Sequence, residues 1–371
     1  MRQFIWQQPG WPELLIDLGA LARTLTGAAF AQGEVAGAIR SLSQPDRDRA
    51  MVDTMVETAI ETSQIEGEQL SIASVRASLA RRHDRRVPRE SGADARADGI
   101  VAITADVQQN ARAPVTKARL FRWHAELFSE APRSLTVGEW RTERDDPMRV
   151  VSGPVTARVT HFEAPPAALV DTEMERFLDW FESPNDLPAL VHAAVAHLRF
   201  LTVHPFSDGN GRIGRAIADL RLTRTAGETA RFISLSREIR KERREYYDAI
   251  ERAQRGNLNV TPWVDWFIGA YCRAATDTLR SIDDLTRANR FWHAHRDIAF
   301  NARQRAVLER YLAGSFDWLN STKYAATAKT STDTAQRDLT DLVAKRIIVL
   351  NDGKARKTSY RLADDFGGRS G

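Results

Sequence analysis

The chain has 371 residues, of which 43% are apolar and 27% are charged. This length suggests two or three domains, and the composition excludes a disordered chain, a collagen-like fibre and a disulfide scaffold. The longest weakly charged stretch, residues 189–198, is too short to span a bilayer, and the N-terminus shows no signal-peptide pattern. The single cysteine and eight histidines show no zinc-binding spacing. We therefore expect a cytoplasmic protein that does not contact the membrane.

The net charge of +4 is unevenly distributed along the chain. From residue 301 onward there are 13 Lys and Arg against 8 Asp and Glu. This excess is larger than the net charge of the whole chain, so residues 1–300 are slightly acidic. The asymmetry indicates either a contact with nucleic acid or another acidic surface at the C-terminal end, or an ordinary solvated face.

Residues 1–90 are expected to form a helical region. An aromatic segment with two prolines, residues 4–12, precedes a helical run over 14–42. Residues 47–64 then show the apolar spacing of an amphipathic helix. The charged stretch 81–94 has the composition of a loop and marks the clearest early boundary.

A mostly helical domain is predicted for residues 114–273. A segment rich in Val, Thr, Gly and Pro interrupts it at 150–166 and predicts a hairpin. A helical linker over 274–300 leads to the C-terminal part. The predicted fold class is therefore mainly α, with one hairpin inserted between helices.

The C-terminal part, residues 301–365, shows a different pattern. Helical runs at 304–312, 321–328 and 332–345 precede short strands at 347–350 and 358–362, which flank a turn at 352–354. A helix-turn-helix followed by a hairpin is the order found in a winged helix-turn-helix domain.

The chemically most informative stretch is residues 204–215, HPFSDGNGRIGR. It lies between two apolar helices, so it forms a loop that runs into a helix N-terminus. Gly209 and Gly211 flank Asn210, and such glycines let successive backbone N–H groups converge on an anion, where the helix dipole adds positive charge. The stretch therefore predicts a phosphate-binding turn.

Side chains around this turn fit nucleotide phosphate chemistry. Arg212 and Arg215 are three residues apart, so both project from one side of the helix and are able to hold phosphate oxygens. Asp208 is a hard oxygen ligand suited to Mg²⁺, and His204 supplies a base near neutral pH. The alternative is a structural histidine, a plain glycine loop and a solvated arginine pair. Their combination within 12 residues favours the functional interpretation.

The same stretch resembles the Fic (filamentation induced by cyclic AMP) signature, His-x-Phe-x-Asp/Glu-Gly-Asn-Gly-Arg-x-x-Arg, and matches it at every fixed position. The resemblance extends over about 114–273 and includes the segments 122–124, 138–141, 246–247 and 263–267. Residues 6–12 and the winged helix are also similar to accessory regions of bacterial Fic proteins. The fold implied by this resemblance is a Fic-type helical domain with a β-hairpin flap.

Membership of this family implies transfer of AMP from ATP to a Ser, Thr or Tyr hydroxyl of a target protein. By this resemblance His204 deprotonates the hydroxyl and Asp208 holds Mg²⁺. Arg212 neutralises the β-phosphate, and Arg215 holds the γ-phosphate. The residues expected to bind the phosphates are Gly209, Asn210, Gly211, Arg212, Ile213, Gly214 and Arg215.

The hairpin and a later helix complete the site that the resemblance implies. The exposed hairpin edge would add a segment of a target protein, or of another copy of the chain, as an extra strand. Its expected residues are Val150, Val151, Ser152 and Gly153. The adenine and ribose pocket is expected to be lined by Tyr246, Tyr247 and Gln254. The alternatives are an ordinary surface hairpin, core aromatic rings and a surface amide.

A carboxylate breaks the apolar pattern of the helix expected at 47–64. Projected at 100° per residue, Glu66 falls on the face built from Val52 and Ala59, where a buried carboxylate requires a cationic partner. Glu57 and Glu61 project to the other side and are expected to be solvated.

Resemblance suggests the partner of Glu66. Thr62, Glu66 and Gly67 match the family's inhibitory motif Ser/Thr-x-x-x-Glu-Gly/Asn, whose glutamate pairs with the second signature arginine, here Arg215. We therefore predict a transferase that is repressed in cis. The alternative is a structural Glu–Arg pair without regulatory effect.

Two further activities stay open within the same family. A glutamate near the metal site would allow water to remove AMP from a modified protein. A few relatives transfer UMP, phosphocholine or phosphate in place of AMP, although the intact phosphate-binding stretch favours ATP. The target protein and the oligomeric state, including a homodimer, are not readable from the sequence.

A DNA-binding regulator is the alternative from another functional class. In it the Fic domain acts as a nucleotide switch, and the winged helix contacts DNA phosphates through Arg337, Lys354, Arg356 and Lys357. The same candidate recognition helix also contains Asp333, Asp338 and Asp341, which would repel DNA. Docking of another protein is therefore the competing role for this domain.

Overall fold

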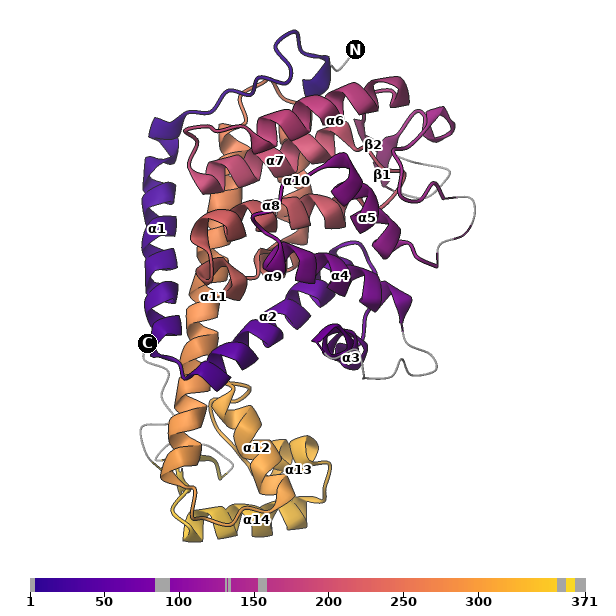
Figure 1. The fold of residues 1–371 in the computed structure, drawn as a ribbon. Helices are drawn as coiled ribbons and strands as arrows, with labels where there is room; N and C mark the ends of the chain where they lie inside the picture. The colour runs from indigo at the N-terminus through magenta and orange to yellow at the C-terminus, as the bar shows by residue number, and fades with distance from the viewer. Residues whose placement is uncertain are drawn as a thin grey trace. The chain divides into compact units, whose positions relative to one another are not determined.

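The computed structural model describes residues 4–83, 94–130, 132, 135–152, 159–351 and 358–363. Contacts divide the chain into two compact units, residues 1–40 with 47–278, and residues 41–46 with 279–371. The described residues are mainly helical, which confirms the predicted fold class (Figure 1). Among them, no helix has the length and apolar character needed to cross a bilayer.

The N-terminal elements of the chain are η1 (Ile5–Gln7), α1 (Leu18–Ser41), α2 (Gln44–Ile65) and α3 (Ile72–His83). The aromatic segment before α1 is anchored on later parts of the first unit. The indole nitrogen of Trp6 donates to the Glu163 carbonyl at 2.7 Å, and that of Trp11 donates to the Glu173 carboxylate at 2.8 Å. The helix expected to begin at residue 14 begins at Leu18, because Leu15 instead pairs as an extended bridge with Asn259.

The remaining elements that lie in or begin in the first unit are α4 (Ala95–Gln109), α5 (Lys117–Leu127), η2 (Glu143–Asp145), β1 (Arg149–Ser152), β2 (Val159–Glu163), α6 (Ala167–Glu182), α7 (Ala189–Val203), α8 (Asn210–Ala226), η4 (Thr229–Phe232), α9 (Leu235–Lys241), α10 (Arg243–Gln254) and α11 (Thr261–Ala294). α7 packs against α6 and α8, and every residue from 190 to 203 is buried. Such a helix, buried on all sides, forms the centre of a helical domain.

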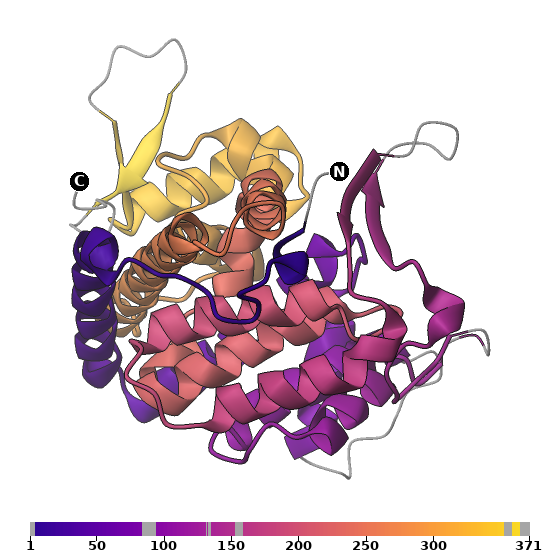
Figure 2. The same cartoon turned by 90° about the horizontal axis from the view of Figure 1, so that it is seen from above.

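The hairpin is formed by antiparallel pairing of β1 and β2, with an irregularity in register between Val150 and Val151. Figure 2 shows that it projects away from the helices of the first unit. The predicted hairpin therefore exists, and its strands carry both valines at partly exposed positions. α11 is continuous from Thr261 to Ala294, across the boundary expected between a catalytic domain and a linker.

The second unit contains α12 (Ala302–Leu312), α13 (Ser321–Ala328), α14 (Thr332–Ala344), β3 (Ile348–Leu350) and β4 (Tyr360–Leu362). Side chains of Asn301, Asn320 and Ser331 cap the three helices. Apolar side chains from all five elements form one core, which includes Leu308, Tyr324, Leu339, Ile348 and Leu362. This is the predicted element order, while the turn expected at 352–354 lies outside the described residues. Its assignment as a winged helix stays a prediction.

Two histidines of α7 are fully buried. Burial lowers the pKa of His192 to about 3 and that of His197 to about 4. His192 stacks on Trp180 with ring centroids 4.4 Å apart, and neither of its ring nitrogens has a hydrogen-bond partner among the described residues. Both rings are therefore neutral in the folded chain at neutral pH.

We expect these histidines to make the fold sensitive to mild acid. An unfolded histidine takes up a proton near pH 6.5 while the buried ring does not, so stability is lost as the pH falls from about 6.5 towards 4, by about 1.4 kcal/mol per pH unit for each ring. Thermal melts between pH 7.5 and pH 5 would measure the loss. His192→Phe keeps an aromatic ring against Trp180, so it should melt normally at pH 7.5 and lose less stability in acid. Equal acid sensitivity of the variant and the parent would contradict this origin.

Candidate functional site

His204 ends the central helix α7 at the start of the signature stretch. It caps the helix in a left-handed conformation with φ of 52°. Its Nδ1 lies 3.2 Å from the Leu201 carbonyl oxygen. Because a carbonyl only accepts, Nδ1 carries the ring proton and Nε2 keeps its lone pair. Burial lowers the pKa of His204 to about 4, so the ring is a neutral proton acceptor at pH 7.

Arg141 holds the backbone on which His204 sits, and we did not predict this role from the sequence. Its Nε donates to the His204 carbonyl at 2.8 Å, and its backbone N–H donates to the Pro205 carbonyl at 2.9 Å. Its Nη1 pairs with Asp146 at 2.7 Å, and the side chain is buried. Because a left-handed non-glycine residue needs external support, Arg141 positions the imidazole.

The turn that follows is fixed by two further side chains. Asn210 is hydrogen-bonded to the backbone of Phe206 in both directions, accepting from its N–H at 3.0 Å and donating to its carbonyl at 2.7 Å. His124 accepts from the Gly138 N–H at 3.0 Å, so its other nitrogen carries the proton and lies 3.2 Å from the Asp208 carbonyl. The Asn210 amide therefore shapes the turn, and backbone N–H groups are the donors left to face an anion.

The turn reaches the N-terminus of α8 through Gly209, which adopts a φ of 79°. A Cβ atom there would lie 2.8 Å from the Phe128 ring, so both conformation and space require glycine. The first N–H groups of a helix have no partner within the helix, and together with the helix dipole they attract anions. The structure thus gives this stretch the form of an anion-binding helix N-terminus.

A carboxylate already lies at this N-terminus. A Cβ atom on Gly211 would lie only 2.0 Å from Oε1 of Glu66. The same oxygen is 2.8 Å from Nη2 of Arg215. Arg215 also donates from Nε to the Thr62 hydroxyl at 2.7 Å and from Nη2 to the Thr62 carbonyl at 2.9 Å. The end of α2 therefore lies against the start of α8.

The charges at this contact support an ionised pair. Burial by itself raises the pKa of Glu66, but the positive charge of Arg215, with smaller contributions from Arg212 and Arg243, outweighs burial and lowers it. The side chain of Arg215 is only 3% exposed. Such a desolvated cation requires an anion beside it, whether a carboxylate or a phosphate.

The route by which Glu66 reaches Arg215 differs from the predicted one. α2 ends at Ile65, so Glu66 does not lie on the apolar face of the helix but in the turn that follows. The prediction failed because the helical projection was extended past the helix end, which Gly67 sets with a φ of 86°. Glu57 was also expected to be solvated, but it pairs with Arg237 at 3.1 Å.

Arg212, the other signature arginine, has a carboxylate partner that we did not anticipate. Its Nη1 lies 2.9 Å from both carboxylate oxygens of Glu68. The guanidinium also lies over the Phe128 ring, 5.2 Å from its centroid. The only sequence signal was the place of Glu68 directly after the Glu66-Gly67 pair, and the motif used to find Glu66 does not include it.

The three residues expected around the nucleotide base differ in how far they are buried. Tyr246 is buried and its hydroxyl lies 2.7 Å from Nε2 of His197, while the buried Gln254 amide lies 3.4 Å from the Thr202 hydroxyl. Tyr247 is 37% exposed, and its hydroxyl donates to the Ile65 carbonyl at 3.4 Å. Tyr247 is thus the one of these three with an exposed ring beside the end of α2.

The other predicted site residues are described only in part. Val150 and Val151 lie on β1, 37% and 41% exposed, which leaves them open to a partner. Of Ser152 only the backbone is described, and Gly153 lies outside the described residues. Ile213 is buried, and Gly214 packs close to α7.

Asp208 is the side chain suited to a metal ion. It is 62% exposed, and its Oδ1 accepts from the Gly209 N–H at 2.6 Å. Within the described part of the chain, no group of three or more His, Cys, Asp and Glu side chains gathers around a metal position. A single exposed carboxylate beside an anion-binding turn fits Mg²⁺, which keeps several waters and is held jointly by phosphates.

Comparison with known proteins agrees with this geometry. Residues 114–222 match the Fic/DOC family, and residues 4–84 match a domain of unknown function, DUF4172. A protein adenylyltransferase Fic of Nematostella vectensis is 33% identical over 91 residues, which cover 24% of this chain and 20% of that protein. A probable protein adenylyltransferase of Aquifex aeolicus is 25% identical over 99 residues, or 27% of this chain and 28% of that protein. The matched stretches thus span about a fifth to a quarter of these relatives.

Solved structures show the same fold. A Fic family protein from Desulfovibrio desulfuricans superposes with a TM-score of 0.53 at 20% identity, covering 93% of this chain and 97% of that one. A fragment of Fic-1 from C. elegans superposes with a TM-score of 0.52 at 21% identity, covering 71% of this chain and 73% of that one.

The hairpin and the anion-binding turn after the central helix both lie within the residues that match the Fic/DOC family. The chain is a Fic-family protein, and its Fic domain matches over residues 114–222.

Gly67→Ala should destabilise the chain by about 1 kcal/mol, because an alanine in the left-handed region clashes with its own backbone. Urea unfolding curves would measure the change. Gly33→Ala is the matched control: Gly33 lies inside α1 with open space around it, so alanine there should raise stability by up to about 1 kcal/mol. Loss of stability in both variants, or in neither, would show that the conformation of Gly67 has no such role.

Proposed function

We propose that this chain is a protein adenylyltransferase that transfers AMP from ATP to a Ser, Thr or Tyr hydroxyl of a target protein, and that Glu66 holds it in a repressed state. One observation carries the proposal. The Glu66 carboxylate lies on the α8 N-terminus and on Arg215, where the signature would place nucleotide phosphates. The adenylyltransferase names of the similar proteins support this donor and reaction.

In the proposed reaction the hydroxyl oxygen of the target attacks the α-phosphorus of ATP. The new O–P bond forms as the bond to the β-phosphate oxygen breaks, and pyrophosphate leaves. The hydroxyl proton passes to Nε2 of His204, whose lone pair is free because Nδ1 is hydrogen-bonded to Leu201. The lowered pKa of His204 keeps it neutral, and therefore able to accept, throughout the neutral pH range.

Most of the barrier in phosphoryl transfer is lowered by positioning and by charge stabilisation. The backbone N–H groups at the start of α8 would hold phosphate oxygens, with Arg212 at the β-phosphate and Arg215 at the γ-phosphate. Asp208 would hold Mg²⁺, which neutralises phosphate charge when bound. Val150 and Val151 on the hairpin edge would align the target segment.

Repression follows because the Glu66 carboxylate and a nucleotide phosphate compete for the same place beside Gly211 and Arg215. A carboxylate and a phosphate oxygen cannot both occupy the space above Gly211, and Arg215 cannot face both. ATP would then bind with its γ-phosphate displaced and the α-phosphate out of line. The same carboxylate is placed to orient a water molecule, so removal of AMP from a modified protein is part of the proposal as the reverse activity.

Replacing Glu66 with Gly should release the transferase. The variant is incubated with Mg²⁺ and ATP labelled at the α-phosphate. It should label itself or proteins of an added lysate at least about tenfold faster than the parent, because the loss of one desolvated charged contact changes an equilibrium by about that factor. Mass spectrometry with each nucleoside triphosphate in turn would identify the transferred group and its acceptor.

Two controls accompany this experiment. Glu57→Gln removes a carboxylate of α2 that pairs with Arg237 rather than with a signature arginine, and it should leave labelling at the parental level. His204→Ala in the Glu66→Gly chain should lower the rate by about 10²-fold or more. Undiminished labelling without His204, or no transfer by the Glu66→Gly chain with any nucleotide, would refute the proposal.

A DNA contact through the second unit is the second candidate function, favoured by the position of Asp338. This residue was expected to repel DNA from α14, but it is buried and pairs with Arg303 at 2.8 Å and with the Tyr324 hydroxyl at 3.0 Å. The expectation failed because Asp338 lies on the inner face of α14. The exposed groove along α14 carries Gln336, Arg337 and Thr340 beside Asp333 and Asp341. The other expected contacts, Lys354, Arg356 and Lys357, lie outside the described residues.

A salt series with random duplex DNA tests this candidate. If α14 contacts phosphates, log K should fall linearly with log salt, and Arg337→Ala should reduce the slope by about 1. Arg176→Ala removes an exposed arginine of α6 and serves as the control. Failure to bind DNA at low salt would leave protein docking as the role of this unit.

A further inference from the structure

The turn that ends α2 presents two carboxylates to α8. The Gly67 N–H donates to the Gln64 carbonyl at 3.0 Å and the Glu68 N–H donates to the Ser63 carbonyl at 3.0 Å. With Gly67 in the left-handed conformation, these two bonds form a Schellman motif. The reversal places Glu66 just before the glycine and Glu68 just after it. Both side chains then reach signature arginines, Glu66 to Arg215 and Glu68 to Arg212.

The contact between Glu68 and Arg212 differs from an ordinary surface pair. The Arg212 side chain is 5% exposed, whereas the arginine of the surface pair Arg176–Glu173 is 58% exposed. One nitrogen of Arg212 faces both oxygens of Glu68 at 2.9 Å. Because a desolvated cation interacts more strongly with a carboxylate than a solvated one does, this contact holds Arg212 in place, and Asp208 Oδ1 lies farther away, 3.9 Å from its Nη2.

Both arginines nevertheless keep unused donors. Nη1 of Arg215 and Nε of Arg212 are buried and have no hydrogen-bond partner among the described residues. A carboxylate offers two oxygens, whereas a polyphosphate offers more and carries more charge. The two glutamates therefore leave buried arginine donors that a ligand with more oxygen atoms, such as a polyphosphate, could use.

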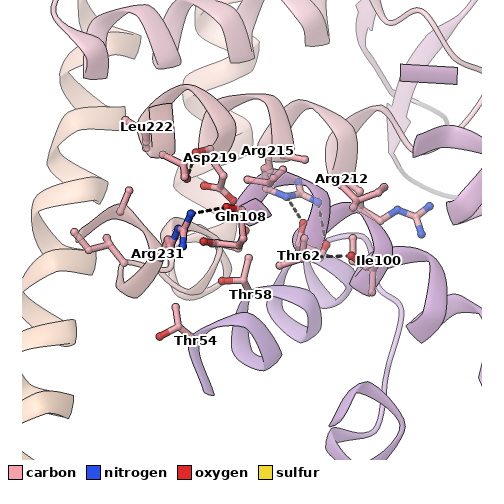
Figure 3. A pocket seen from close by; sticks show the side chains of 18 of the residues that line it. Thr54, Thr58, Thr62, Ile100, Gln108, Arg212, Arg215, Asp219, Leu222 and Arg231 are labelled. Atoms are coloured by element: carbon pink, nitrogen blue, oxygen red, sulfur yellow. Dashed lines mark hydrogen bonds between the residues drawn. The ribbon is translucent and has the colours of Figure 1, made fainter. Parts of the chain in front are cut away.

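Towards the cavity beside α8, α2 presents a row of hydroxyl groups. Figure 3 shows Thr54, Thr58 and Thr62, one helical turn apart on α2, beside a small cavity that Arg215 and Asp219 of α8 also line. Apolar packing would hold the helices together whatever the state of the arginines. The buried apolar side chains of α2, Met55, Val56, Ala59, Ile60 and Ile65, supply such packing elsewhere along the helix. The two ion pairs therefore act on the turn after α2 rather than on the attachment of the whole helix.

We propose that Glu68 is a second inhibitory carboxylate, which withholds Arg212 from the nucleotide as Glu66 withholds Arg215. This inference rests on the proposed function and deepens its regulation. Release of Glu66 frees only one of the two arginines, and Glu68 keeps a negative charge beside the place of the β-phosphate. Full activity therefore requires that the whole turn after α2 moves away from α8, which frees both arginines at once.

A double-mutant cycle tests the second carboxylate. The variants are Glu66→Gln, Glu68→Gln and the double substitution, with Glu57→Gln as a matched carboxylate of α2 whose arginine partner lies outside the site. Two quantities are measured on the full chain: the Kd for ATP with Mg²⁺ by calorimetry, and the initial rate of labelling. The double variant should bind ATP and label protein roughly tenfold better than Glu66→Gln, the ratio expected for one desolvated charged contact.

The outcomes separate this inference from the proposed function. If the double variant neither binds nor labels better than Glu66→Gln, Glu68 is not inhibitory and the inference is overturned, while the transferase stands. If ATP binding tightens through Glu68→Gln but no variant labels any protein, Glu68 still withholds Arg212 and the proposed transfer is what fails. Melting temperatures are recorded for each chain, and Glu68→Ala replaces Glu68→Gln where the latter does not fold.

Discussion

The ion pair between Glu66 and Arg215 is the interaction on which the state of this site depends. A buried guanidinium requires an anion, and the α8 N-terminus attracts one, so the two form a single place for negative charge. In this structure the chain fills that place with its own carboxylate. Under the proposed function, activity and repression correspond to a phosphate or Glu66 occupying this place, and a phosphate would first have to displace Glu66.

A separate set of hydrogen bonds brings distant segments together at the signature. Arg141, which precedes the hairpin, holds the His204 and Pro205 carbonyls, and His124 connects the Gly138 N–H to the Asp208 carbonyl. The hairpin base is thus tied to the turn that carries the imidazole. A target segment seated on the hairpin would be aligned with His204 through a short chain of hydrogen bonds, which favours transfer geometry without recognition of much target sequence.

Local chemistry was predictable where one stretch of chain contains the whole signal. Residues 204–215 contain their own helix end, left-handed glycine and arginine spacing, so the turn and its direction followed from pattern alone. Arg141 and His124 escaped prediction because their roles come from backbone atoms of other segments, and a hydrogen bond to a carbonyl leaves no mark on residue type. Glu68 escaped prediction because its partner, the Arg212 side chain, lies far away in the sequence. The burial of Tyr246 and Gln254 likewise depends on how α10 packs.

The sequence by itself determined the mainly helical fold, the hairpin, the family and the residues able to do phosphate chemistry, because helix periods, glycine conformations and a dense motif are local properties. The tertiary structure decided which charges meet. It ended α2 one residue before Glu66, turned the chain at Gly67, and so brought two carboxylates onto two arginines from a helix about 150 residues away. Pairing across such a separation depends on how helices pack, and packing is set by the whole core rather than by any one segment.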